Sequence, residues 1–330
     1  MEIFMRKIIE FIKNILPFNN RTEMPGPLYV IKVVLIFFFF KFAGELIGEA
    51  FAIGIHFACG LNPLQGELFD ANTITLITYL GYSLIIAVIL VLWKLFQKKT
   101  IAEIGFTKRF GSYFAGIAVG TVLLAACIIP IMMTGALQFN GVFANIDTKM
   151  VLLMIPCFIF QGAVEEVLCR GVVQQLLVKK TSVPVAFAVS AALFTIPHIS
   201  NMSEAGVVIA VTAIVNLVLI SLIFSFLTLR FRSIWAACGL HAVWNYILYT
   251  VLGLNLSGKD EIVTAIFDVR TVGSNVLNGA VYGIEASIVT TVVLAFAVVI
   301  CFALCRKDAA ADDRSRVSFS GVHETGHEFG

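Results

Sequence analysis

The hydrophobic residues of this chain fall into eight long segments, each near the length that a helix needs to cross a lipid bilayer. About 20 apolar residues span the hydrocarbon core. The pattern predicts an all-α fold: a polytopic membrane bundle of about eight transmembrane helices. The segments cover residues 28–58, 74–96, 113–136, 150–178, 183–200, 205–229, 233–252 and 283–305.

The pattern also predicts two flanking parts around this membrane domain of residues 28–305. Residues 1–27 begin with an amphipathic stretch that ends at Pro17, and we predict an interfacial helix there. An ordinary cytoplasmic lead-in is the alternative. Residues 306–330 are polar and are predicted to form a disordered C-terminal tail.

Composition agrees with a membrane protein. Hydrophobic residues make up 59% of the chain and charged residues 13%, against about 25% charged in a typical soluble domain. The net charge is only +2 and no basic run is interleaved with aromatic residues, so we expect the lipid bilayer as a partner and no nucleic acid. The seven cysteines form no Cys-x-x-Cys pair, and no disulfide framework is expected.

The distribution of basic residues predicts the orientation. Lysine and arginine are enriched in the cytoplasmic loops of membrane proteins. With the N-terminus in the cytoplasm, most basic residues fall in the inside segments. The outside loops then hold only Lys149, Lys259 and Arg270. We therefore expect an integral protein of the plasma membrane with both termini cytoplasmic.

Charged side chains inside an apolar segment are the first candidates for chemistry. Glu165 and Glu166 lie within residues 150–178, and Arg170 follows on the same segment. Residues four apart share a helix face, so Glu166 and Arg170 can pair while Glu165 points elsewhere. Unpaired Glu165 is therefore the candidate general base. A structural ion-pair cluster without chemistry is the alternative.

Later segments add further polar groups at membrane depth. His198 ends one segment, and His241 and Asn245 lie four residues apart on another. A polar group in hydrocarbon must find partners, and these residues are available to one another and to Glu165. Their combination favours a functional site over separate packing roles.

These residues resemble the motifs of a known family. The pattern is similar to that of the CAAX-protease and bacteriocin-processing-enzyme (CPBP) family of intramembrane proteases, also called the Abi family. The resemblance spans Phe160 to Tyr246 and rests on three motifs, Glu165-Glu166-x-x-x-Arg170, Phe194-x-x-x-His198 and His241-x-x-x-Asn245.

The resemblance implies a helical bundle enclosing a polar intramembrane cavity, and a role for each motif residue. Glu165 would activate water as the general base, and His198 would assist that water or the oxyanion. His241 and Asn245 would complete the oxyanion and water-binding side.

In the same scheme the pair formed by Glu166 and Arg170 would orient the site. No cofactor is required in this scheme. A metalloprotease remains the alternative, since Glu165, His198 and His241 are also a possible ligand set for Zn²⁺.

A second zinc-like pattern lies in the tail and is rejected. His323-Glu324-Thr325-Gly326-His327 matches His-Glu-x-x-His. It contains a glycine and lies near the end of a polar tail, which cannot hold the geometry or exclude water.

The first apolar segment carries its own charged stripe. Lys41, Glu45 and Glu49 follow each other at i+4 spacing, and His56 comes one to two turns later. We expect Lys41 to pair with Glu45 inside the bundle; contact with substrate is the alternative. Two glycine pairs, at 44/48 and 116/120, could allow close helix approach.

The sequence as a whole predicts an intramembrane endopeptidase that hydrolyses peptide bonds of membrane-associated substrates with glutamate-activated water. Two rivals are kept: an ion-coupled secondary transporter, in which the same residues relay protons, and a catalytically idle immunity or scaffold protein. Convergence of Glu165, His198, His241 and Asn245 on one water-sized space would favour the peptidase.

Overall fold

The computed structural model describes residues 2–258 and 264–324, and it confirms the all-α prediction. In chain order the helices are α1 (Glu2–Ile15), α2 (Gly26–Ala58), α3 (Ala71–Leu92), α4 (Ser112–Met133), α5 (Thr148–Glu166), α6 (Gln175–Val178), α7 (Val183–Thr195), α8 (Val207–Phe231), α9 (Trp235–Tyr246) and α10 (Ile288–Glu324).

The other regular elements are short. Strands β1 (Leu137–Val142) and β2 (Phe267–Thr271) form one antiparallel pair at one end of the bundle. Among the described residues, three π-helical segments continue longer helices, and five 3₁₀ segments lie in connections or at helix ends. The π segments are η2 (Trp93–Gln97), η4 (Val167–Gln174) and η6 (Ile247–Val251), and the 3₁₀ segments are η1 (Pro63–Gln65), η3 (Ile101–Ile104), η5 (Ile196–Met202), η7 (Ala280–Tyr282) and η8 (Ile284–Ala286).

Within the part of the chain that the structure describes, six helical segments are long and apolar enough to cross a membrane, two fewer than the eight predicted. They cover residues 71–97, 112–133, 148–178, 183–202, 207–231 and 288–310. The predicted span at 28–58 is the long helix α2, which carries four charged side chains. The predicted span at 233–252 is α9 with η6, which is shorter than a full crossing.

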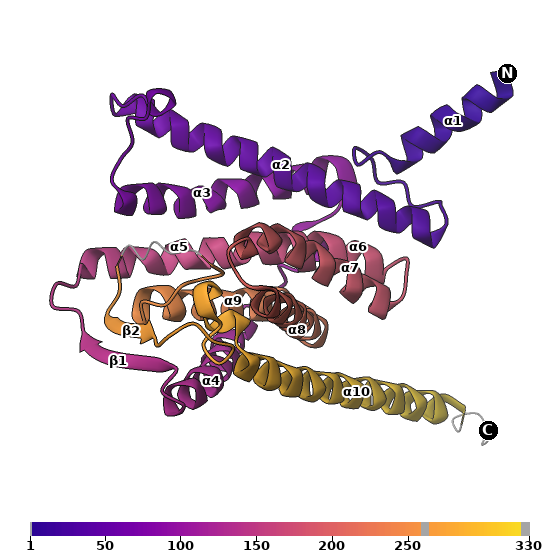
Figure 1. Ribbon diagram of the computed structural model, residues 1–330. Coiled ribbons are helices and arrows are strands. Elements are labelled where there is room, and N and C mark those ends of the chain that lie inside the picture. Colours follow the sequence, from indigo (N-terminus) through magenta and orange to yellow (C-terminus); the bar gives the residue numbers. More distant parts are fainter. Residues whose placement is uncertain (1, 259–263, 325–330) are drawn as a thin grey trace.

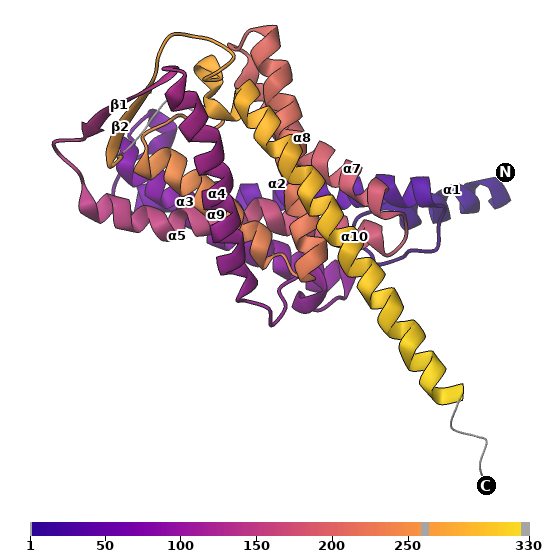
Figure 2. The same cartoon turned by 90° about the horizontal axis from the view of Figure 1, so that it is seen from below.

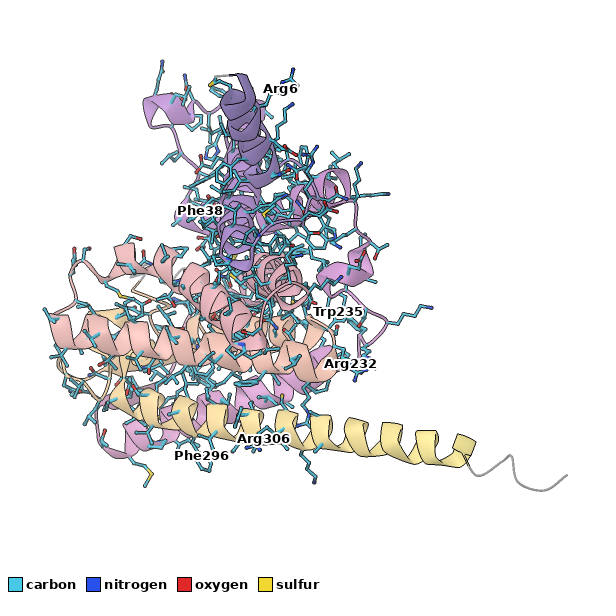
Figure 3. All side chains as sticks on the ribbon, turned by 90° about the vertical axis from the view of Figure 1, so that its right-hand side faces the viewer. Arg6, Phe38, Arg232, Trp235, Phe296 and Arg306 are labelled. Carbon is cyan, nitrogen blue, oxygen red and sulfur yellow. The ribbon has the colours of Figure 1, made fainter. Side chains whose placement is uncertain are left out.

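The helices are arranged in layers (Figure 1). Helices α2 and α3 form one layer, α5 to α7 a middle layer, and α8 and α9 a third, with α4 and α10 on its outer side (Figure 2). Outward-facing apolar side chains suit a lipid environment. Phe296 on α10 points away from the bundle in Figure 3 and is 68% exposed.

Both glycine pairs mark close helix contacts. A Cβ added at Gly116 would lie 2.0 Å from the Ala236 carbonyl oxygen, and one added at Gly120 would lie 2.7 Å from Val243, so α4 packs directly on α9. Gly44 meets Ile85 in the same way and brings α2 onto α3. Small residues permit such backbone approach in membrane helices.

Helix α1 forms where the amphipathic stretch predicts it and ends before Pro17. It projects from the bundle in Figure 1, and Phe18, just after it, packs on Phe39 with ring centroids 4.7 Å apart. Its placement at a membrane interface stays a prediction.

The predicted disorder of the polar tail, residues 306–330, stays a prediction. Helix α10 continues through residues 306–324, because extending an existing helix adds one hydrogen bond for each residue fixed, which is far easier than starting a new helix. The rejected His-Glu-x-x-His pattern lies only in part within the described residues, because His327 falls outside them.

The charged stripe of α2 is confirmed in its main feature. Lys41 pairs with Glu45, and both side chains are partly exposed to the central cavity described below. Glu49 is exposed and takes no part in this pair, whereas His56 is buried with its Nδ1 2.8 Å from the Ala52 carbonyl oxygen.

Candidate active site

Three buried side chains, those of Glu166, Arg170 and His241, meet at one carboxylate oxygen. Glu166 closes α5, and its Oε1 accepts a hydrogen bond from Arg170 Nη1 at 3.1 Å. The same oxygen lies 3.0 Å from His241 Nδ1 on α9. Both side chains of the Glu166–Arg170 pair are 0% exposed. The predicted pairing at i+4 is confirmed, and the contact with His241 is an addition that sequence spacing cannot show.

Arg170 is held by hydrogen bonds and by aromatic contacts, although its Nε has no hydrogen-bond partner among the described residues. Its Nη2 donates to the carbonyl and to the hydroxyl of Ser221 on α8. Its guanidinium carbon lies 4.8 Å from the ring centroids of both Phe194 and Phe224. Cation–π contacts of this kind are worth about 0.5–2 kcal/mol each. The arginine is therefore fixed by three other helical segments.

The four predicted water-handling residues face one cavity. This cavity has a volume of about 240 Å³ and lies at the centre of the bundle. Its wall includes Glu165, His198, His241 and Asn245. Further lining residues come from α2, α3 and the loop before α10, among them Lys41, Tyr79, Tyr82, Ser257 and Glu285.

His198 enters from η5, which continues α7 past Thr195. Its Nδ1 lies 2.9 Å from the Phe194 carbonyl oxygen, and the two rings are 5.2 Å apart. Phe194 also contacts the His241 ring at 6.0 Å. Phe194 therefore contacts both histidines as well as the buried Arg170.

Gln161 and Ser221 belong to the site, and both were missed from the sequence. Gln161 Nε2 donates to Glu165 Oε1 at 3.0 Å, and Gln161 Oε1 accepts from Asn245 Nδ2 at 2.7 Å. Its position four residues before Glu165 was the available signal, because the two share a helix face. Ser221 is 51 residues from Arg170, so the sequence held no such signal for it.

Local backbone irregularity accompanies two motifs. The π segment η4 begins directly after Glu166 and contains Arg170, and η6 begins two residues after Asn245. A π segment shifts the register of the side chains that follow it and is frequent at functional sites. Gly162 adds a close approach, since a Cβ there would lie 3.0 Å from the Ala242 amide nitrogen of α9.

The alternative metal-ligand set can be compared with the geometry. Within residues 2–258 and 264–324, no three histidine, cysteine, aspartate or glutamate side chains are grouped so as to hold one metal ion. Glu165, His198 and His241 line the same cavity without forming such a group. The chain's arrangement does not fit a preformed zinc site of these residues, and the metal-free scheme stays a prediction.

The fold and the site define an integral membrane protein with a glutamate- and histidine-lined cavity inside a helical bundle. Residues 147–247, from the start of α5 to the end of α9, match the family model described as type II CAAX prenyl endopeptidase Rce1-like. This match agrees with the resemblance to the CAAX proteases and supports a peptidase at the level of the family. No curated protein and no solved structure gives a significant match.

Proposed function

We propose that this protein is an intramembrane endopeptidase that hydrolyses peptide bonds of membrane-associated peptides or proteins. One observation carries the proposal: Glu165, His198, His241 and Asn245, from three separate helical segments, line a single cavity. The peptidase family of residues 147–247 supports it independently.

In the proposed reaction, Glu165 takes a proton from water as the water oxygen attacks the substrate carbonyl. Glu165 is suited to this role because it has no cationic partner among the described residues and lines the cavity. A positioned general base contributes about 10² to 10⁴ in rate. The proton then passes to the leaving amine as the C–N bond breaks.

The oxyanion would be stabilised by His241, with His198 assisting the water or the oxyanion. A carboxylate only accepts hydrogen bonds, so the contact with Glu166 requires a proton on His241 Nδ1. This fixes the ring orientation. For Nε2 to donate a hydrogen bond to the oxyanion, the ring must carry a second proton there, as an imidazolium paired with Glu166. The pair of Glu166 with Arg170 would in this way orient the histidine, much as an acidic residue orients a catalytic histidine elsewhere.

The test is the loss of activity in Glu165→Gln, a nearly isosteric change. Membranes containing wild type or Glu165→Gln are compared by peptidomics, which also identifies the substrate. Peptides that appear only with wild type are expected. Full turnover by a correctly folded Glu165→Gln protein would refute the assignment of the base. Equal peptide profiles, together with proton-coupled solute uptake that requires Glu165, would favour the transporter.

We also propose that the protein lies in the plasma membrane with both termini cytoplasmic. The basic residues favour this orientation, and the ends of α1 and α10 lie on the same side of Figure 1, opposite β1 and β2. Reporter fusions at the two termini should both give the cytoplasmic signal. A periplasmic or extracellular signal from either one would overturn the orientation.

A further inference from the structure

One side chain connects the proposed base to the opposite wall of the cavity. Gln161 lies one helical turn before Glu165 on α5 and bonds to Glu165 with its amide NH₂ group, at 3.0 Å. With its carbonyl oxygen it accepts a hydrogen bond from Asn245 on α9, at 2.7 Å. All three residues line the central cavity. The bridge therefore joins two helices across the site.

The direction of these bonds follows from the chemistry of the groups. An ionised carboxylate has no hydrogen to donate, so Gln161 must present its NH₂ group to Glu165. The carbonyl oxygen of Gln161 then faces α9, and Asn245 must donate to it with its own NH₂ group. Within the described part of the chain, Glu165 Oε2 and Asn245 Oδ1 are left without a hydrogen-bond donor.

Because Gln161 occupies Oε1, the second carboxylate oxygen of Glu165 is left free to take a proton from water. We propose that Gln161 is a positioning residue: it holds Glu165 and Asn245 at a fixed separation across the cavity, so that Glu165 Oε2 is aimed at the attacking water. This inference rests on the proposed peptidase function.

The proton balance of the step supports the arrangement. The water O–H bond to Glu165 breaks, its proton binds Oε2, and the water oxygen forms the bond to the carbonyl carbon while the carbonyl π electrons move onto oxygen. Because Gln161 occupies Oε1, the proton is directed to Oε2. The bridge through Gln161 persists in both protonation states of Glu165, so the base stays in place until the proton reaches the leaving amine.

Gln161→Met tests this role, because methionine has similar length and makes neither hydrogen bond. The substrate is the peptide that wild type cleaves and Glu165→Gln does not. We expect kcat to fall about 10- to 100-fold, the loss of a hydrogen bond to a charged group, with KM nearly unchanged. The acidic limb of the activity–pH profile should move to higher pH, because the ionised carboxylate loses a donor.

Gln174→Met is the matched control. Gln174 is buried, at 2% exposure, and like Gln161 it joins two helical segments, by donating to the Ser225 carbonyl oxygen. It does not line the cavity. The same substitution there should change the melting temperature at most, and leave kcat and the pH profile as in wild type.

A double-variant cycle separates positioning from general packing. If Gln161 acts through Asn245, then Gln161→Met combined with Asn245→Ala should lose little more than the worse single variant. Additive losses, or an unmoved pH profile in Gln161→Met, would overturn the inference while the peptidase function stands.

A substrate-free measurement keeps the inference testable if no cleavage is found. The carboxyl band of Glu165 is assigned by infrared difference spectroscopy between wild type and Glu165→Gln, and its titration is followed in Gln161→Met and Gln174→Met. A displaced titration only in Gln161→Met is expected. An unchanged titration refutes the link to Glu165, whereas absence of peptidase activity in wild type refutes the proposed function.

Discussion

Replacing Glu166 by glutamine should destabilise the protein, in contrast to the same change at Glu165. The glutamine carbonyl can take the place of Oε1 and still accept from Arg170 and His241. Its NH₂ group can take the place of Oε2, which has no hydrogen-bond partner among the described residues. The substitution therefore removes the charge while it can keep both hydrogen bonds.

The magnitude follows from what remains around Arg170. Breaking a fully buried ion pair costs about 3–5 kcal/mol. Arg170 keeps its two bonds to Ser221 and its contacts with two aromatic rings, so we expect the lower end, about 3 kcal/mol. At about 2 °C of melting temperature per kcal/mol for a large domain, this corresponds to a decrease of roughly 6 °C.

The assay is thermal unfolding of the detergent-solubilised protein. Glu103→Gln is the matched control: Glu103 also has two cationic partners, Lys99 and Lys179, but it is partly exposed. Exposed ion pairs contribute little, so its melting temperature should stay close to wild type at neutral pH. Glu165→Gln should also melt normally. If Glu166→Gln melts like wild type while Glu165→Gln unfolds early, the two roles are reversed.

Two further results are expected. The pKa of Glu103 is lowered to about 2, first by the hydrogen bond from the Thr100 amide and then by its lysine partners. The ionised Glu103 therefore stabilises the fold above the unfolded pKa of about 4.3, and this contribution is lost as pH falls toward 2. The small difference in melting temperature between wild type and Glu103→Gln should vanish over that range. Truncation after Ser320 removes both tail histidines and should leave peptidase activity intact, also in the presence of a chelator; if zinc restores a chelated, truncated protein, the cavity residues bind metal.

Local geometry is what the sequence by itself determined. The apolar segments identified a helical membrane protein, because their length and composition depend on the bilayer and not on neighbouring elements. The Glu166–Arg170 pair followed from i+4 spacing, and the structure confirms it. The family resemblance was likewise contained in three short motifs, and the family match over residues 147–247 confirms it.

Packing between distant segments is what only the tertiary structure decided. The contact of His241 with Glu166 joins residues 75 positions apart, and the bridge from Gln161 to Asn245 depends on the close approach of α5 to α9 at Gly162. Apolar spacing shows which face of a helix is buried but not which helix covers it. The short helix α9 shows the same limit. Most of its residues are buried, and a segment surrounded by other helices need not be as long or as apolar as one that contacts lipid.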